Sequence, residues 1–399
     1  MHEFLDFGLA QTTLSPLNLR VKSANGVYIE LADGRKLIDF VSGIGVSTYG
    51  HGHPKIKQAL HEQVEAHLHV MVYGEFRQSA QDAAAVSLLA LLPTALDAVY
   101  FVNSGAEAID GALKLARKSS GRKSFLSLKD GYHGNTFGAL SISSNKERRA
   151  PFEPLMEGVD FIALNDFEDL QRIDGSHAAV IMETVQGDAG VRIPHQEWMH
   201  ALRNRCDETG TLLILDEIQC GIGRTGKPFA FEHFGIVPDV LCLGKAIGAG
   251  VPMGAFVSGK ERMKTLAESP SLSHITTFGG HPLACAAAAA GFDLLNSMDW
   301  AEIESRGSRI EERIRAHGAV VEVRRIGYFI AVELDRSDAV HFCVQHALKN
   351  GLLIFYFLST PQAFRITPPL TMTDDEIDDA LNILCSALDA WKTSDAPLH

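Results

Sequence analysis

The stretch LLILDE, residues 212–217, is an unbroken apolar run that ends in two acids. A second run, VLCL at residues 240–243, is followed directly by Gly244 and Lys245. Strands that read as continuous apolar segments are typical of parallel sheets, because helices cover both faces of such sheets. We therefore expect both runs to be interior strands of an α/β sheet.

The same pattern continues on both sides of this stretch. Helical patterns lie between several apolar runs, for example at Ala106–Lys118 and Glu197–Thr209. Strand–helix alternation predicts a mostly parallel sheet with helices on both faces. The seven runs that we interpret as strands are Ala98–Val102, Ser124–Leu128, Val159–Leu164, Ala178–Met182, Leu212–Leu215, Val240–Leu243 and Ala255–Val257.

The sequence changes in character near residue 290. A charged helical pattern at Trp300–His317 is followed by strand-like residues at Val320–Leu334 and by helical patterns at Ala339–Asn350 and Asp374–Trp391. We expect three regions. Residues 1–50 would form an N-terminal arm and part of a small domain, residues 51–290 a large domain, and residues 291–399 the C-terminal part of the small α+β domain.

Composition narrows the possible partners and the compartment. The 399 residues carry 36 Lys and Arg against 49 Asp and Glu, a formal net charge of −13, which argues against nucleic acid or an anionic membrane as partner. No apolar stretch reaches the ~20 residues of a membrane span, and residues 1–15 lack the pattern of a signal peptide. The six cysteines form no CxxC pair, which favours free thiols in a reducing compartment. We expect a cytoplasmic protein.

The stretch NSGAEA, residues 103–108, follows an apolar run and begins a helical pattern. Backbone N–H groups at the start of a helix suit a phosphate. An ordinary helix cap by Ser104 explains the same residues, and taken alone it is the more common case.

Two further features stand at the ends of the quoted runs. Asp216 ends its run at the edge where α/β sheets bind ligands, and it could hold a cationic nitrogen or a metal. A helix cap or a surface ion pair is the alternative. Lys245 lies among glycines after an apolar run, where partial desolvation favours the neutral amine that Schiff-base chemistry needs. A lysine that reaches solvent is the alternative. The GxGxxG match at residues 221–226 is not followed by a helical pattern, so we reject a dinucleotide site.

Together these features describe one cofactor. A phosphate cradle, an acid for a ring nitrogen and a Schiff-base lysine are the parts of a pyridoxal phosphate site. The stretch TTFGGHP, residues 276–282, adds hydroxyls that could reach a phosphate. No metal is expected, since His61 and His67 are six residues apart rather than the four of an HExxH site.

The sequence resembles the class III pyridoxal-phosphate-dependent aminotransferases, and most closely their acetylornithine/ornithine group. The resemblance rests on DEIQ at residues 216–219 with GRTG at 223–226, and on Gly244-Lys245 followed by PMGA at 252–255. It extends from DFVSGI at residues 39–44 to RITPPL at residues 365–370. It implies the aspartate-aminotransferase fold (fold type I), with a seven-stranded, mainly parallel sheet in the large domain and a small α+β domain.

The resemblance also implies roles for individual residues. Lys245 would form the Schiff base and move the proton, and Asp216 would pair with the ring nitrogen. Thr277 would reach the phosphate of the neighbouring subunit, which implies a homodimer, and Arg365 would bind the substrate α-carboxylate. The remaining residues that the resemblance implies for cofactor binding are Ser104, Gly105 and Ala106 for the phosphate, Tyr132, Ile218 and Gln219 around the ring, and His133 and Glu183.

Departures from the family concern the substrate. Asn135 stands where relatives carry a carboxylate-binding arginine, and an asparagine cannot supply a charge-assisted contact. Ile44 replaces a tyrosine near the substrate. Asp188 is one methylene shorter than the glutamate that gates the arginine in relatives, which weakens the expectation that it pairs with Arg365. Tyr73 is a candidate pocket residue, and a core or interface position is an equal alternative.

These observations predict an enzyme that transfers the amino group of an ω-amino acid, such as ornithine or acetylornithine, or of a related amine, to 2-oxoglutarate. The small-molecule donor and the 2-oxo acid are the expected partners. The alternative is an aminomutase, racemase or decarboxylase of the same fold, and a non-catalytic protein on this scaffold is disfavoured by the intact Lys245 and Asp216.

Overall fold

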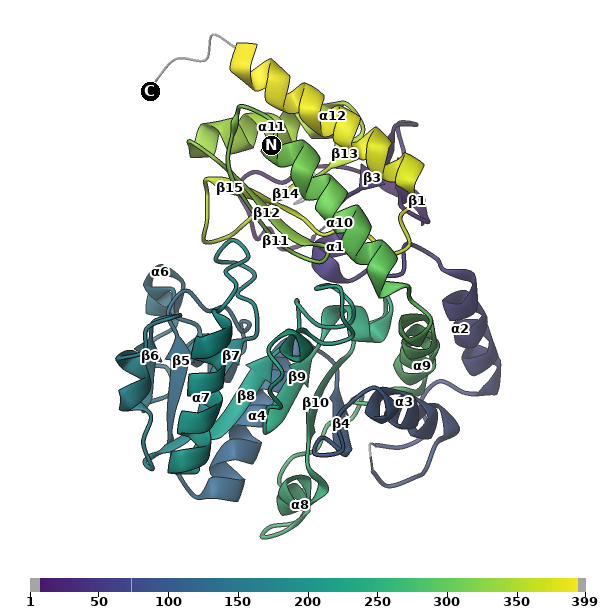
Figure 1. Cartoon of the computed structure of the whole chain (residues 1–399). Coiled ribbons are helices and arrows are strands. Elements are labelled where there is room, and N and C mark those ends of the chain that lie inside the picture. Colours follow the sequence, from purple (N-terminus) through teal and green to yellow (C-terminus); the bar gives the residue numbers. More distant parts are fainter. Residues whose placement is uncertain (1–7, 73, 394–399) are drawn as a thin grey trace.

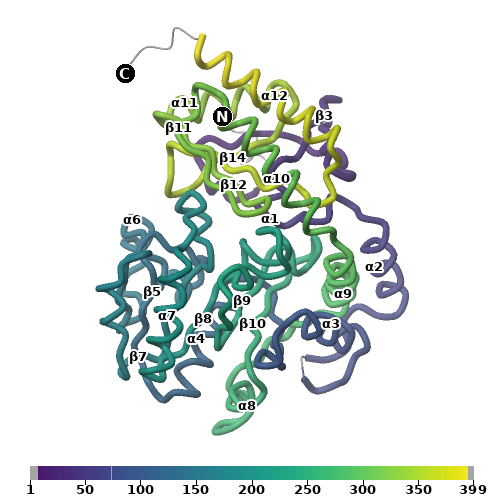
Figure 2. The backbone as a smooth tube through the Cα atoms, viewed as in Figure 1, coloured from purple at the N-terminus to yellow at the C-terminus, as the bar shows by residue number. Residues whose placement is uncertain are grey.

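The structure is a computed structural model that describes residues 8–72 and 74–393. The chain forms a larger body around a wide sheet and a smaller body beside it (Figure 1). In Figure 2 the purple N-terminal and yellow C-terminal parts of the tube lie together in the smaller body, while the blue and teal middle of the chain builds the larger one. The domain boundaries near residues 50 and 290 stay a prediction.

The larger body is built on a seven-stranded sheet in the order β4-β10-β9-β8-β7-β5-β6. β10 is antiparallel to both of its neighbours, and the other pairs are parallel. The expected seven-stranded, mainly parallel sheet is confirmed. Its strands are β4 (Ala98–Val102), β5 (Ser124–Leu128), β6 (Val159–Ile162), β7 (His177–Glu183), β8 (Leu212–Asp216), β9 (Val240–Leu243) and β10 (Gly254–Ser258).

Alternate residues of β8 enter two separate cores, one on each face of the sheet. On β8, Leu213 and Leu215 belong to one core and Ile214 to the other. This is why the strand reads as an unbroken apolar run. The main helices of the larger body are α2 (Pro54–Ala66), α3 (Ser79–Ala90), α4 (Gly105–Ser120), α7 (Gln196–Thr209) and α9 (Pro282–Asn296).

The smaller body joins the two ends of the described chain in one core. Val27 and Phe40 pack with Ile330 and Leu381 there, in a cluster that draws on both ends. Two four-stranded sheets, β1-β2-β3-β13 and β11-β12-β15-β14, lie in this body. Its elements are β1 (Val21–Asn25), β2 (Tyr28–Leu31), β3 (Lys36–Asp39), α10 (Trp300–Arg315), β11 (Val320–Ile326), β12 (Phe329–Leu334), α11 (Ser337–Lys349), β13 (Leu352–Leu353), β14 (Phe355–Tyr356), β15 (Ala363–Ile366) and α12 (Asp374–Thr393).

Short helices connect these elements. They are α1 (Ser42–Gly45), α5 (Phe137–Ile142), α6 (Lys146–Arg149), η2 (Ala150–Phe152), η3 (Asp169–Arg172), η4 (Ala230–His233), η5 (Lys245–Gly248), α8 (Lys260–Lys264) and η6 (Thr265–Ala267). Within the described residues, no helix is long and apolar enough to cross a membrane.

The glycine-rich stretch at residues 221–226 is a structural joint. Arg224, within this stretch, is buried. It donates from Nη1 to Pro368 O at 2.6 Å and from Nη2 to Thr48 Oγ1 at 3.2 Å. These acceptors come from the two ends of the chain, so Arg224 ties the larger body to the smaller one. The stretch opens no crossover helix, in agreement with the rejection of a dinucleotide site.

Candidate active site

Three ionisable side chains, two carboxylates and one amine, lie at one edge of the large sheet. Glu183 and Asp216 are the last residues of β7 and β8 and stand opposite each other in the register. Lys245 follows the end of the next strand, β9. Because these strands are parallel, their carboxyl ends meet at the same edge, where α/β sheets bind ligands.

Asp216 is buried and held by two contacts. His133 Nδ1 lies 2.7 Å from Asp216 Oδ2, and the backbone N–H of Ile218 donates to Oδ1 at 2.9 Å. The carboxylate is therefore fixed in orientation before any ligand binds. His133, which the sequence assigns only by resemblance, is the residue that positions Asp216.

The environment of Lys245 favours its neutral amine. Burial lowers the pKa of Lys245, while the negative charges of Asp216 and Glu183 act in the opposite direction. The backbone of Lys245 has φ of 49°, in the left-handed region that few residues other than glycine adopt. A strained backbone at a lysine with a perturbed pKa is typical of a functional position.

The N-terminus of α4 lies in a tight cradle. Ser104 caps the helix by accepting from Glu107 N at 3.2 Å, so the N–H groups of Gly105 and Ala106 have no intrahelical acceptor. A Cβ at Gly254 would lie 2.1 Å from Ser104 O. A Cβ at Gly105 would lie 2.8 Å from the Ile218 side chain. Only glycine permits this approach, and it leaves free N–H donors close to the end of β8.

Gln219 supplies a further donor. Its Nε2 is buried and has no hydrogen-bond partner among the described residues. A Cβ at Gly187 would lie 2.3 Å from Gln219 Oε1, so a larger residue there would displace the Gln219 amide. A buried unpaired amide costs free energy, which a bound polar group would recover.

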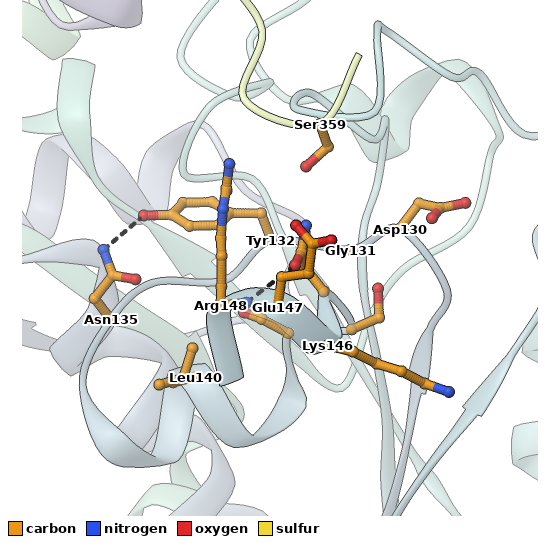
Figure 3. A pocket seen from close by; sticks show the side chains of 12 residues that line it. Asp130, Gly131, Tyr132, Asn135, Leu140, Lys146, Glu147, Arg148 and Ser359 are labelled. Atoms are coloured by element: carbon orange, nitrogen blue, oxygen red, sulfur yellow. Dashed lines mark hydrogen bonds between the residues drawn. The ribbon is translucent and has the colours of Figure 1, made fainter. Parts of the chain in front are cut away.

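Tyr132 and Glu183 form the wall beside this edge. Glu183 accepts from Tyr132 N at 3.0 Å and from Gly187 N at 2.8 Å, and burial raises the pKa of Glu183 to about 7. Asn135 Nδ2 donates to the Tyr132 hydroxyl at 3.2 Å (Figure 3). Asn135 therefore orients Tyr132 through an uncharged hydrogen bond. An arginine at this position would add a positive charge.

Arg365 and Asp188 meet in the interior. Arg365 Nη2 lies 3.4 Å from Asp188 Oδ1, its Nε donates to Tyr356 O at 3.1 Å, and the guanidinium lies over the Phe357 ring. Burial lowers the pKa of Arg365, and Asp188 opposes this. The shorter acid does reach Arg365, but at a distance longer than the 2.7–2.9 Å typical of a strong ion pair.

Three further residues of the sequence prediction, Thr277, Tyr73 and Ile44, stay predictions. Thr277 is exposed, whereas its neighbour Thr276 accepts from Asn103 Nδ2 at 3.2 Å. Tyr73 lies outside the described residues. Ile44 is partly buried in a left-handed segment, with φ of 64°. A β-branched residue in that region is strained, which is common beside functional sites.

The sequence reasoning missed Arg148 on α6. Its Nη1 lies 3.6 Å from Asp188 Oδ2, and its Nη2 donates to Leu358 O at 2.9 Å. Arg148 and Tyr132 line the same cavity of 390 Å³ (Figure 3). The only signal in the sequence is the charged stretch KERR at residues 146–149, which is typical of any solvated helix.

Comparison with known proteins now assigns the family. A family profile described as aminotransferase class-III matches residues 10–388. The chain belongs to the class-III aminotransferase family. It is therefore an aminotransferase, as the resemblance implied, and the enzyme prediction is confirmed.

Relatives of this aminotransferase cover nearly its whole length. Acetylornithine aminotransferase of Methanopyrus kandleri is 40% identical over 383 residues, which are 95% of this chain and 96% of the relative. A [LysW]-aminoadipate semialdehyde/glutamate semialdehyde transaminase of Sulfurisphaera tokodaii is 35% identical over 91% of this chain and 93% of the relative. A structure of Toxoplasma gondii ornithine aminotransferase, with PLP partly occupying its active site, has a TM-score of 0.89 and 29% identity over 98% of this chain and 94% of that one.

Proposed function

We propose that this aminotransferase uses pyridoxal phosphate to move the amino group of an ω-amino acid to 2-oxoglutarate. The observation that carries the proposal is the partly buried Lys245 beyond the end of β9, whose pKa is lowered by burial while the Asp216 and Glu183 carboxylates act in the opposite direction. The relatives named for acetylornithine and ornithine support a terminal amine as the reacting group.

The residues present fit this cofactor. The N–H groups at the start of α4, beside the capping Ser104, suit a phosphate, since a helix N-terminus binds anions. The unpaired Gln219 Nε2 suits the ring hydroxyl. The proposed contacts to the two ring faces are Ile218, which packs against the start of α4, and Tyr132.

In this mechanism the chain's own groups orient the reactants and move the proton. Pyridoxal phosphate supplies, when bound, a ring that accepts negative charge from the reacting carbon. Asp216, fixed by His133 and by Ile218 N–H, is proposed to hold the proton of the ring nitrogen. Lys245 is proposed to bond to the cofactor and then to carry the proton at Nζ, because burial favours its neutral form.

A homodimer with shared sites belongs to the same proposal. Exposed apolar side chains lie at residues 68–71, at Phe76 and at residues 272–278. The ring centroids of His69 and Phe278 lie 5.2 Å apart, so the two segments are in contact. Contiguous exposed apolar surface favours an interface. Thr277 is exposed within this surface, where it could reach the phosphate of the partner's site.

We also propose that the protein works in the cytoplasm. All six cysteines are unpaired, and five of them are buried. Free thiols of this kind are typical of proteins in reducing compartments.

The decisive experiment follows the visible absorption of the purified enzyme with its cofactor. Acetylornithine, ornithine, glutamate and simple ω-amines are added separately, followed by 2-oxoglutarate. The true donor is expected to bleach the visible band, and 2-oxoglutarate is expected to restore it while a product aldehyde accumulates. A band that no donor changes would contradict transamination and favour another reaction of this fold.

Lys245→Ala tests the assigned residue. Its turnover is expected to fall by about 10³-fold or more, because a nucleophile and a proton carrier are lost together. Lys349→Ala, at an exposed position on α11, is the matched control and is expected to keep full turnover. Unchanged transamination by Lys245→Ala would overturn the assignment.

A further inference from the structure

Two arginines share one carboxylate at the outer end of the candidate site. Asp188 Oδ1 lies 3.4 Å from Arg365 Nη2, and Asp188 Oδ2 lies 3.6 Å from Arg148 Nη1. Arg365 is buried, whereas one third of the Arg148 side chain is exposed. Asp188 therefore stands between an inner and an outer guanidinium.

Neutral groups hold Asp188 more closely than either arginine does. Leu358 N donates to Oδ1 at 2.8 Å and Ser359 Oγ donates to Oδ2 at 2.7 Å. Both distances to the arginines exceed the 2.7–2.9 Å of a well-formed charge-assisted hydrogen bond. Asp188 would thus keep its hydrogen bonds to Leu358 N and Ser359 Oγ if Arg148 turned to another anion. The group of two arginines and one acid carries a net charge of one positive unit.

Arg148 faces the cavity that Tyr132 and Asn135 also line. Figure 3 shows its side chain directed from α6 into the space beside Tyr132 and Asn135. Arg148 also acts electrostatically on the Tyr132 phenol and opposes the rise of its pKa that burial causes. The charge of Arg148 therefore acts on the wall of the candidate site.

A side-chain cap at the start of α6 fixes the backbone position of Arg148. Asn145 Oδ1 accepts from Arg148 N at 3.1 Å and caps the short helix. The acids Asp130 and Glu147, which also line the cavity, are exposed, so water and salt screen their charges. Among these groups Arg148 is the least exposed charge facing the cavity from α6.

We propose that Arg148 binds the substrate carboxylate farthest from the reacting carbon. The proposal rests on the proposed function and names its substrate class: ω-amino acids and 2-oxo acids that carry a distal carboxylate. A guanidinium presents five N–H donors, and Leu358 O and Asp188 are the partners that the described residues give to Arg148. A carboxylate in the cavity can use the donors that remain, while the neutral Asn135 contributes orientation of Tyr132.

The test compares two donors that differ only in that carboxylate, ornithine and the diamine formed by its decarboxylation. Arg148→Gln is expected to lower kcat/KM for ornithine by about 10- to 100-fold and for the diamine by less than about threefold. Arg148→Lys is expected to fall between, because an ammonium keeps the charge and loses the fork. Lys349→Gln, which removes a charge at an exposed position on α11, outside the residues that line the cavity, is the matched control.

A binding measurement without turnover separates this proposal from the proposed function. Calorimetry of the cofactor-loaded enzyme with glutarate, an unreactive dicarboxylate, is expected to give about tenfold or more weaker binding for Arg148→Gln than for the wild type. Butyrate, with one carboxylate, is expected to bind both equally. Thermal unfolding of each variant shows whether it is folded.

Each outcome decides one of the two statements. Equal losses for both donors, or equal glutarate binding by wild type and Arg148→Gln, would overturn the role of Arg148. A wild type that transaminates neither donor would overturn the proposed substrate class, and the glutarate titration would still decide whether Arg148 binds the distal carboxylate.

Discussion

At the entrance to α4, glycines stand where a side chain has no room. A Cβ at Gly254 would lie 2.1 Å from Ser104 O, and a Cβ at Gly244 would lie 2.9 Å from the Ile218 side chain. Both contacts surround the proposed phosphate position. Steric closeness therefore matters here as much as charge, because the free N–H donors of the helix keep their position only while the neighbouring strands stay close.

Gly254→Ala tests this cradle. Overpacking a rigid site costs about 1–3 kcal/mol of stability, and moving Ser104 would disturb the helix N-terminus. We expect a lower melting temperature and weaker pyridoxal phosphate binding, measured by fluorescence titration of the cofactor-free protein. Gly175→Ala, where a Cβ would meet only Thr209 O at 3.9 Å, is the control and should change neither value. Unchanged cofactor affinity in Gly254→Ala would contradict the cradle.

The residues that sequence reasoning could find are those that end apolar runs. Asp216 and Lys245 stand out because a charged group directly after a buried strand is unusual. Arg148 could not be found in this way. Its partners, Asp188 and Leu358, lie 40 and 210 positions further along the chain and meet it only after folding.

At the scale of elements, the strands of the large sheet were predictable and the connections were not. The runs Ala98–Val102, Ser124–Leu128 and Val240–Leu243 match strands residue for residue. The last of them, β9, is buried throughout and therefore gives an unbroken apolar signal. The left-handed segment at residues 42–44 gave no signal. Its conformation depends on tertiary contacts, which periodicity does not record.

The segment at residues 268–281 is expected to respond to acid through His274. Burial lowers the pKa of His274 to about 4, and Lys114 adds to this while Glu107 opposes it. Lys114 Nζ lies 2.9 Å from His274 Nδ1, so the neutral ring is the acceptor. A folded-state pKa below the unfolded value near 6.5 gives stability that is complete above pH 6.5 and is lost as the pH falls toward 4.

His274→Gln tests that assignment, because a glutamine oxygen can still accept from Lys114 without titrating. Melting temperatures measured from pH 7.5 down to pH 4.5 are expected to fall less steeply in this variant than in the wild type. His61→Gln, at an exposed position on α2, should leave the slope unchanged. If the melting temperature fell equally steeply with pH in all three proteins, His274 would not be responsible for the loss of stability in acid.

At the scale of the whole molecule, the two ends of the chain close over the sheet edge. Arg224, buried between the bodies, donates to Thr48 and Pro368, and Arg365 of the smaller body reaches Asp188 of the larger one. Burial lowers the pKa of Arg224 to about 10, and Asp39 opposes this. The candidate site is thus assembled from parts that no single stretch of sequence contains.

The proposed dimer extends this assembly across two chains, and a mixing experiment can test it. Lys245→Ala and Thr277→Ala are each expected to be weakly active alone. In a mixed dimer, one site would combine Lys245 of the second variant with Thr277 of the first and would be intact. Random pairing of equal amounts should therefore restore about a quarter of the wild-type sites.

The restored activity should appear only when subunits exchange, so co-expressed or co-refolded variants are compared with variants mixed as preformed dimers. Phe278→Glu, within the exposed apolar surface, should shift the sedimentation coefficient to that of a monomer, because a buried charge opposes association. Val321→Glu, at an exposed position on β11 of the smaller body, should stay dimeric. Complementation requires Thr277 to act across the interface. Mixed dimers that gain no activity would therefore show that each site is complete within one chain.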